Sequence, residues 1–339
     1  MSAGQPGDAP AKAGVELPPF AESPVFVAGA SGYIGACLVP RLLDAGYAVR
    51  CLARSPQKLE RRSWARHPRV SIVQGDLFST ADLAALMRGS GAAFYLVHSL
   101  LASGDDDNAR DAACATRFAR AASEAGLARI IYLGGLRETG SNVASRLAGR
   151  SAVAIALGAG GVPATVFRAG MILGSGSVSF EILRYLVERQ PVMFPPKWVK
   201  IDIQPIGVGN VLNYLVACLA EPLTVGRTFD IGGPGIVTYV ELMQVMAEEL
   251  GLRRRLIIPL PVNARRLSAW WISMISPVSR EMVRPLADGL TSPVVCHDHD
   301  AEALMPQRLL APRDAIRSAL EQDQRSEVES AWSDAGAIP

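Results

Sequence analysis

The sequence lacks the features that mark nucleic-acid-binding, disordered or disulfide-stabilised proteins. Charged residues make up 19% of its 339 residues and the formal net charge is +2, so neither a polyanion-binding surface nor a largely disordered chain is indicated. Five cysteines are dispersed along the chain without a C-x-x-C pair, which argues against a disulfide framework and a structural zinc site. We therefore expect a cytoplasmic protein with five buried, reduced thiols, no metal and no nucleic-acid partner.

Long apolar runs are also absent. A helix that spans a bilayer needs about 20 consecutive apolar residues, and the best uncharged stretch, 203–220, is interrupted by proline, glycine and asparagine. The apolar segment 267–279, which contains Trp270 and Trp271, is too short to span. Three interpretations stay open for it: a buried helix face, a cover over a binding cleft, or a peripheral contact with a membrane.

What the sequence does contain, from Pro24 onward, is an alternation of short apolar runs and longer amphipathic segments. The runs are typical of strands buried on both faces and lie at 25–28, 48–53, 70–73, 92–97, 129–133 and 164–168. The segments with helical spacing lie at 34–45, 80–88, 109–125 and 144–157. This alternation is the pattern of βαβ units, and it predicts an α/β fold of the Rossmann type with a doubly wound parallel sheet.

The alternation also predicts how the chain is divided. We assign the Rossmann domain to residues 23–175 and a smaller C-terminal, substrate-covering region to 176–310, with a strand at 227–231 that joins the Rossmann sheet. Residues 1–22 are rich in Ala, Gly and Pro and are predicted to be a disordered tail, and residues 311–339 a C-terminal tail.

Glycine recurs at every third position directly after the first predicted strand, at Gly29, Gly32 and Gly35. The first permits a tight turn, the second lets the backbone approach a pyrophosphate, and the third allows close packing of the following helix. N–H groups at the helix start attract an anion, and the hydroxyl of Ser31 is a further donor. A plain tight turn is the alternative, but the place of the loop in a βαβ series favours a dinucleotide site formed by Gly29, Ser31, Gly32, Tyr33, Ile34 and Gly35.

The end of the second predicted strand favours NADP(H) over NAD(H). An acidic residue about 20 positions after the glycines would bind the ribose 2′-hydroxyl, whereas an arginine accommodates the 2′-phosphate. This chain has Arg54 at that place and no acid before Glu60. We predict that Arg54 contacts the 2′-phosphate, and the alternative is an ordinary solvated arginine.

Six motifs extend the pattern along the chain. They read V-F-V-A-G-A-S-G-Y-I-G at 25–35, G-D-L at 75–77, Y-L-V-H-S at 95–99, I-I-Y-L-G-G-L at 130–136, F-R-A-G-M-I-L-G at 167–174 and F-D-I-G-G-P at 229–234. In these motifs the chain resembles the atypical short-chain dehydrogenase/reductase proteins of the NmrA-like, NAD(P)H-binding kind, which are related to nucleotide-sugar epimerases. The resemblance implies that Asp76 and Leu77 border the adenine and that Val97 and His98 lie beside the cofactor ribose.

The chain departs from this family at the catalytic positions. Catalysing members use a Tyr-x-x-x-Lys pair, in which the lysine lowers the pKa of the tyrosine so that it can exchange a proton with the substrate. If Arg150 takes the place of the lysine, Arg146 stands in the place of the tyrosine. Arginine stays protonated and is a poor general acid, so the usual proton donor is missing. Arg150 could still bind the cofactor ribose or a substrate anion.

The assisting serine of the family is missing as well, because its place falls near Leu133, Gly134 and Gly135. His98 and Ser99 are the nearest polar alternatives, and hydrogen bonding to a loop is the competing role for both. The segment 296–300, Cys-His-Asp-His-Asp, contains metal-ligand residue types, but alternating side chains of an extended segment point to opposite faces.

Two functions are compatible with this sequence. The first is an NADPH-dependent oxidoreductase of a small apolar carbonyl or quinone-like substrate, a class suggested by the apolar segments 256–262 and 267–279. The second is a non-catalytic protein that senses NADPH or uses it structurally within a complex, as suggested by the missing tyrosine and lysine. Redox chemistry stays open because the cofactor supplies the hydride and the protein need only position the partners.

Overall fold

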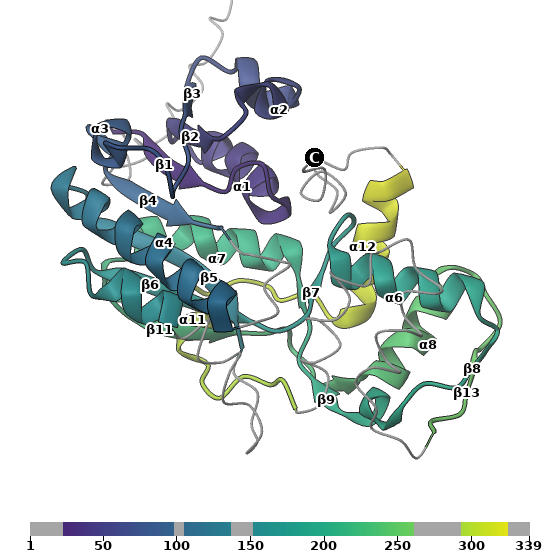
Figure 1. The fold of residues 1–339 in the computed structure, drawn as a ribbon. Coiled ribbons are helices and arrows are strands. Elements are labelled where there is room, and N and C mark those ends of the chain that lie inside the picture. Colours follow the sequence, from purple (N-terminus) through teal and green to yellow (C-terminus); the bar gives the residue numbers. More distant parts are fainter. Residues whose placement is uncertain (1–22, 98–104, 137–151, 261–292, 325–339) are drawn as a thin grey trace, which may run out of the picture.

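Seven parallel strands form the central sheet of the protein (Figure 1). The computed structural model describes residues 23–97, 105–136, 152–260 and 293–324. The strands are β1 (Val25–Ala28), β2 (Val49–Ala53), β3 (Val70–Gln74), β4 (Ala92–Tyr95), β5 (Arg129–Gly135), β6 (Ala164–Ala169) and β11 (Thr228–Ile231). Their order is β11-β6-β5-β4-β1-β2-β3, which confirms the predicted Rossmann-type sheet and the strand near 227–231.

Helices cover both faces of the sheet because alternate residues of each strand point to opposite sides. In β1, Val25 and Val27 belong to one apolar cluster with α1 (Tyr33–Asp44) and α7 (Val208–Ala220). Phe26 and Ala28 belong to a second cluster with α3 (Leu83–Met87) and α4 (Asp105–Glu124). Figure 1 shows α4 and α7 on opposite sides of the strands.

A second apolar core lies beside the sheet and is built from α6 (Val178–Arg189), α8 (Tyr239–Glu249) and α12 (Pro312–Gln324) (Figure 1). Three short strand pairs complete it: β7 (Ile172–Leu173) with β10 (Ile206–Gly207), β8 (Val192–Met193) with β13 (Leu256–Ile257), and β9 (Asp202–Ile203) with β12 (Val237–Thr238). The remaining short elements are α2 (Pro56–Glu60), α11 (Asp300–Leu304) and three 3-10 turns, η1 (Ser63–Arg66), η2 (Lys197–Lys200) and η3 (Pro222–Thr224).

The structure corrects two expectations. Strand β3 is not buried on both faces, since it is the edge strand of the sheet and its residues are half-buried or exposed. Residues 312–324, expected to belong to a tail, form α12, whose Ile316 is fully buried against α8 and α6. The segment has helical spacing, but it lies beyond the alternation of strands and helices that predicts the two domains.

Pro40 is accommodated inside α1, which continues to Asp44. Within the described ranges, no helix has the length and apolar character needed to cross a membrane.

Candidate functional site

The glycine loop lies where the order of the strands reverses. Strand β1 is flanked by β2 on one side and by β4 on the other. After β1 the chain adds β2 and β3 on one side, and it then crosses to the other side of β1 to form β4. The loops that leave the carboxyl ends of β1 and β4 therefore diverge. Sheets of this kind bind their ligands in the crevice that such diverging loops leave open.

Two glycines of the loop have no space for a side chain. Gly29 has a φ of +96°, and a Cβ atom there would lie 2.6 Å from the carbonyl oxygen of Leu96, directly after β4. A Cβ atom at Gly35 would lie 2.8 Å from the Cα atom of Ala30 and would overlap the carbonyl oxygen of Gly29. The loop, the start of α1 and the end of β4 are therefore packed backbone against backbone.

Helix α1 begins without a capping side chain. Its N-cap is Gly32, whose N–H donates to the carbonyl oxygen of Gly29 at 3.0 Å, and its first turn contains no acidic residue. The N–H groups of Tyr33, Ile34 and Gly35 have no acceptor inside a helix, and the helix dipole adds positive potential at this end. Such a terminus suits a phosphate group, and the exposed Ser31 lies directly before it.

Arg54 follows β2 directly and is exposed. Its carbonyl oxygen accepts a hydrogen bond from Nε2 of Gln74 at 3.5 Å, which ties the ends of β2 and β3 together. Since β2 is the neighbour of β1, the Arg54 side chain leaves the sheet at the same edge as the glycine loop. The geometry is compatible with the predicted phosphate contact, which stays a prediction.

The loop after β3 is held by two residues. Oδ1 of Asp76 accepts the N–H groups of Phe78 at 2.7 Å and Ser79 at 3.1 Å, so this carboxylate closes a turn. From α4, the Arg117 guanidinium donates to the carbonyl oxygen of Leu77 at 3.1 Å and to those of Phe78 and Thr80. The family resemblance points to Asp76 and Leu77 but not to Arg117, because no motif around Arg117 shows which loop it reaches.

Tyr33 connects the glycine loop to the C-terminal region. A Cβ atom at Gly174 would overlap the Tyr33 hydroxyl, and Val208 at the start of α7 closes the same space at 2.6 Å. Burial, with smaller contributions from Cys37 and Glu181, raises the pKa of the Tyr33 phenol well above its usual range. Tyr33 therefore stays protonated and is placed to position this junction.

A buried ion pair closes the sheet edge at β6 and β11. Nε of Arg168 donates to Oδ1 of the fully buried Asp230 at 2.6 Å, and Oδ2 of Asp230 accepts the N–H of His297 at 2.9 Å. Asp298 lies 3.9 Å from Arg168, so the segment 296–298 is fastened to the sheet. Across the residues that the structure describes, no three His, Cys, Asp or Glu side chains are grouped as metal ligands.

Several predicted positions lie outside the described residues: His98, Ser99, Arg146, Arg150 and the segment 267–279 with Trp270 and Trp271. Val97, the last described residue before this gap, is half-buried after β4. Leu133, Gly134 and Gly135 form the carboxyl end of β5, where the assisting serine of the resembled family would stand.

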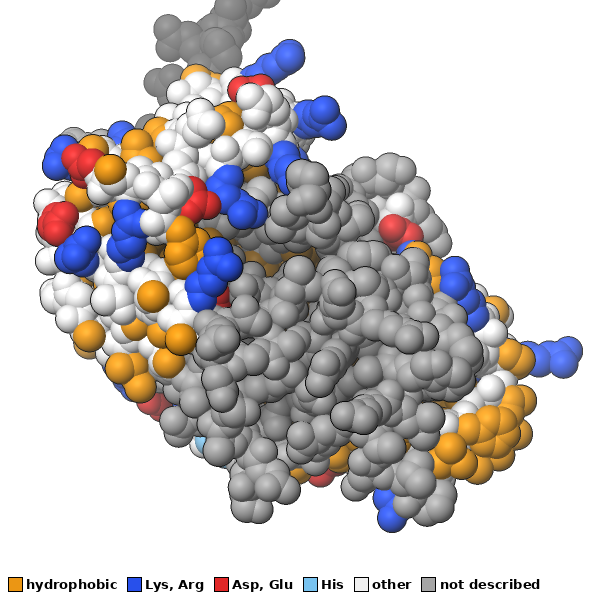
Figure 2. All heavy atoms as spheres, in the orientation of Figure 1, with side chains coloured by type: hydrophobic (Ala, Val, Ile, Leu, Met, Phe, Trp, Pro, Cys, Tyr) orange, Lys and Arg blue, Asp and Glu red, His pale blue; other side chains and the backbone are white. Residues whose placement is uncertain are grey.

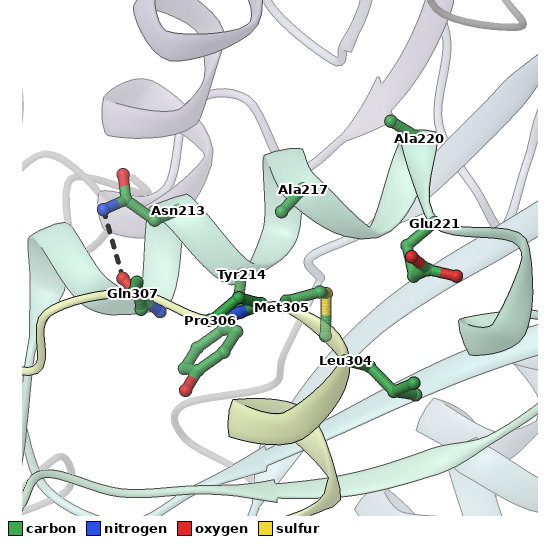
Figure 3. Close-up of a pocket in the computed structure, with 9 residues that line it drawn as sticks. All are labelled: Asn213, Tyr214, Ala217, Ala220, Glu221, Leu304, Met305, Pro306 and Gln307. Carbon is green, nitrogen blue, oxygen red and sulfur yellow. Dashed lines mark hydrogen bonds between the residues drawn. The ribbon is translucent and has the colours of Figure 1, made fainter.

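A pocket separate from the glycine loop lies between α7 and the chain around α11 (Figure 3). Tyr214 and Ala217 line it from α7, and Leu304 and Met305 from the other side. Nδ2 of Asn213 donates to Oε1 of Gln307 at 3.1 Å at its rim. None of its lining residues belongs to the loops after β1, β2 or β4, so we do not assign it to the dinucleotide.

A comparison with known protein families indicates which kind of ligand the glycine loop binds. The profile described as NAD(P)H-binding matches residues 29–140, from Gly29 through β5. Over this stretch, about a third of its length, the chain is similar to the NAD(P)H-binding family. The match confirms the family resemblance and the binding of an NAD(P)(H) cofactor.

Two kinds of curated relatives are similar to parts or most of the chain. The 3-beta-hydroxysteroid dehydrogenase of Mycolicibacterium neoaurum is 37% identical over 71 residues, which is 21% of this chain and only 18% of that enzyme's length. The ceramide reductase of Caulobacter vibrioides is 26% identical over 287 residues, 79% of this chain and 89% of the relative.

Solved structures share the fold. The Citrobacter sp. triphenylmethane reductase complexed with NADP(H) has a TM-score of 0.69 at 18% identity and covers 87% of this chain and 99% of its own. A nucleoside-diphosphate-sugar epimerase from Staphylococcus aureus has the same TM-score at 16% identity, with the same coverage. At these identities the likeness concerns the arrangement of the sheet and the smaller region beside it.

Proposed function

We propose that this protein is an NADPH-dependent reductase of an apolar carbonyl compound. The observation that carries the proposal is the uncapped start of α1 together with an arginine, Arg54, at the end of the neighbouring strand β2. A dinucleotide pyrophosphate suits the first, and a ribose 2′-phosphate suits the second.

The fit of the cofactor follows from the residues present. Gly29 holds the loop backbone against the end of β4, and Gly35 holds the start of α1 against the loop, so that the N–H groups at the helix start would bind the pyrophosphate. Asp76 and Leu77, on a loop held by Arg117, would border the adenine. When bound, NADPH supplies a hydride to the carbonyl carbon of the substrate. The carbonyl oxygen then takes a proton from His98, from water or from a group of the substrate itself.

Composition and similarity both indicate the substrate class. The chain has an apolar segment at 267–279. The Caulobacter vibrioides relative, which aligns with 79% of the chain, is named a ceramide reductase. A substrate with a long apolar part and one reducible carbonyl group fits both facts.

A sensor of NADPH without catalysis is the second candidate. It is favoured by Leu133, Gly134 and Gly135 at the carboxyl end of β5, where no hydroxyl is present to assist a proton transfer. Arg146 and Arg150 add to it because neither can replace the tyrosine of the usual pair.

The role of Arg54 is tested by charge reversal. We expect Arg54→Glu to weaken NADPH binding by more than about tenfold and to leave NADH binding unchanged, because only NADPH carries the 2′-phosphate. Quenching of protein fluorescence on titration with each cofactor measures both affinities. Arg66→Glu, at another exposed arginine of the same domain, is the matched control. An unchanged preference in Arg54→Glu would refute the assignment.

Oxidation of NADPH in the presence of substrates distinguishes the reductase from the sensor. Purified protein is mixed with NADPH and a panel of quinones, enones, aldehydes and long-chain ketones, and cofactor absorbance is followed. Oxidation of NADPH by an apolar carbonyl compound supports the reductase. Tight binding with no turnover on any member of the panel favours the sensor, and failure to bind either dinucleotide contradicts both.

A further inference from the structure

The small strand pair β8 and β13 presents an apolar face to solvent. The strands are parallel, with Leu256 opposite Val192 and Ile257 opposite Met193. Two residues further along each strand the same register places Ile258 beside Phe194, since the N–H of Ile258 donates to the carbonyl oxygen of Met193 at 2.9 Å. Side chains alternate between the two faces of a strand, so all four outward positions are apolar.

The exposure of these residues agrees with the register. Val192, Phe194, Leu256 and Ile258 are 44%, 52%, 55% and 44% exposed, whereas Met193 between the first two is fully buried. Met193 packs into the core that α6, α8 and α12 form. The four outward residues thus form one contiguous apolar patch, which we call the β8/β13 face. Single apolar residues scattered over a surface are ordinary, whereas a contiguous patch indicates a binding surface.

Basic residues surround the β8/β13 face. Arg253 and Arg254 lie before β13, separated from it by Arg255, and Arg189 and Lys197 flank β8; all four are exposed. The two stretches 188–200 and 251–258 contain a single acid, Glu188, which lies 3.9 Å from Arg184. Figure 2 shows the hydrophobic side chains gathered at the lower right edge of this view, where Figure 1 places β8 and β13, with blue side chains around them.

Two acids at the end of α8 are already engaged. Glu249 accepts from Arg313 at 2.7 Å and from Arg317 at 2.9 Å, and Glu248 pairs with Arg313. Positive charge around the face is therefore not neutralised by them. The formal net charge of the whole chain is only +2, so the concentration of positive charge is particular to the surroundings of the β8/β13 face.

We propose that the β8/β13 face binds peripherally to a membrane that carries anionic lipids. The apolar side chains would enter the boundary between headgroups and acyl chains, and the surrounding arginines and lysine would contact lipid phosphates. A second copy of the chain is a poorer occupant, since a two-fold symmetric contact brings the same patch against itself and sets its cations beside like charges. This binding goes beyond the proposed reductase and does not depend on it.

The test uses the full chain and sedimentation with lipid vesicles in the absence of NADPH. We expect binding to vesicles of equal parts phosphatidylglycerol and phosphatidylcholine, weaker binding at high salt, and little binding to pure phosphatidylcholine. Arg253→Glu combined with Arg254→Glu should lower the partition coefficient by more than about tenfold. Phe194→Ser combined with Leu256→Ser should lower it by a similar factor.

Matched controls lie elsewhere on the surface. Arg41→Glu with Arg120→Glu reverses two exposed charges, and Ile155→Ser with Leu223→Ser removes two exposed apolar side chains. Both controls should bind vesicles as the wild type does. Absence of wild-type binding to anionic vesicles would overturn the proposal, as would equal binding by the patch variants and the controls.

The oligomeric state of the protein tests whether a second copy of the chain covers the β8/β13 face instead of a membrane. A wild-type dimer that Phe194→Ser converts to a monomer, with no binding to either vesicle, would assign the face to a second copy and overturn the membrane proposal. NADPH titration of the same variants should give wild-type affinities, so a failure of vesicle binding leaves the proposed reductase untouched.

Discussion

Single residues set the close contacts of the cofactor site. The carbonyl oxygen of Gly29 lies where a side chain of Gly35 would stand, and the carbonyl oxygen of Leu96 lies where a side chain of Gly29 would stand. These contacts fix the distance between the start of α1 and the ends of β1 and β4. The N–H groups at the start of α1 can face a pyrophosphate only while that distance is kept.

We expect Gly35→Ala to lower the free energy of unfolding by about 1 to 3 kcal/mol, because the added methyl group overlaps backbone atoms that cannot move independently. NADPH affinity should fall by about tenfold, since the helix N-terminus shifts from the phosphate. Urea denaturation and cofactor titration measure the two effects. Gly209→Ala in α7 is the control, because a Cβ atom there would meet no other atom within 4 Å. Equal losses in both variants would contradict the steric argument.

At the scale of single residues, the structure also corrects the expectation that all five thiols are buried. Cys51, Cys114 and Cys218 are buried, whereas Cys37 and Cys296 are half-exposed. Burial raises the pKa of both Cys51 and Cys218 to about 12. At Cys296 burial and the nearby Asp230 carboxylate have the same effect, so these three thiols stay protonated at neutral pH.

Among the elements, α4 fixes the loop that follows β3. Arg117 reaches three carbonyl oxygens of that loop, and the Asp76 carboxylate closes its turn from the other side. The aromatic ring of Phe78 lies 4.5 Å below the guanidinium of Arg110, which is also on α4. The loop that is predicted to border the adenine therefore depends on a helix that begins about 30 residues later in the chain.

We expect Arg117→Leu to lower the free energy of unfolding by about 1 to 3 kcal/mol, because three carbonyl oxygens lose a charged donor. NADPH binding should weaken several-fold, and amide exchange at residues 76–80 should become faster. Arg120→Leu, one turn further along α4 with an exposed side chain, is the control. Wild-type exchange rates at residues 76–80 in Arg117→Leu would contradict the proposed role of this arginine.

At the scale of the whole molecule, α12 joins the last part of the described chain to the second core. Ala315, Ile316 and Ala319 are buried against α8, and the ion pairs of Arg313 and Arg317 with Glu249 lie at the edge of the contact. Arg184 of α6 pairs with Asp323 at 2.6 Å, so α12 is held at both ends.

We expect a chain that ends at residue 311 to lose the fold of the second core. Removal of Ile316 and Leu320 alone costs about 3 to 6 kcal/mol of apolar burial, which is a large part of the stability of an ordinary domain. Thermal unfolding followed by circular dichroism should show an early transition or aggregation. A chain that ends at residue 324 keeps α12 and is the control. An unchanged unfolding temperature for the shorter chain would contradict this account of α12.

The sequence by itself determined the dinucleotide half of the protein. The period of two in the strands, the helical spacing between them and the glycines after the first strand are local patterns, and each follows from the few residues that form it. For this reason β1, α1 and the glycine loop could be predicted from Val25 to Gly35, and the strand at 228–231 could be predicted as well.

Only the tertiary structure decided what depends on residues far apart in the chain. Arg117 could not be assigned to the β3 loop, nor Arg168 to Asp230, because side-chain partners 40 or 62 residues away leave no local pattern. The exposed edge position of β3 and the burial of α12 follow from which elements pack beside them. The β8/β13 face is of the same kind: its two strands lie over 60 residues apart, and only their register makes four apolar side chains one surface.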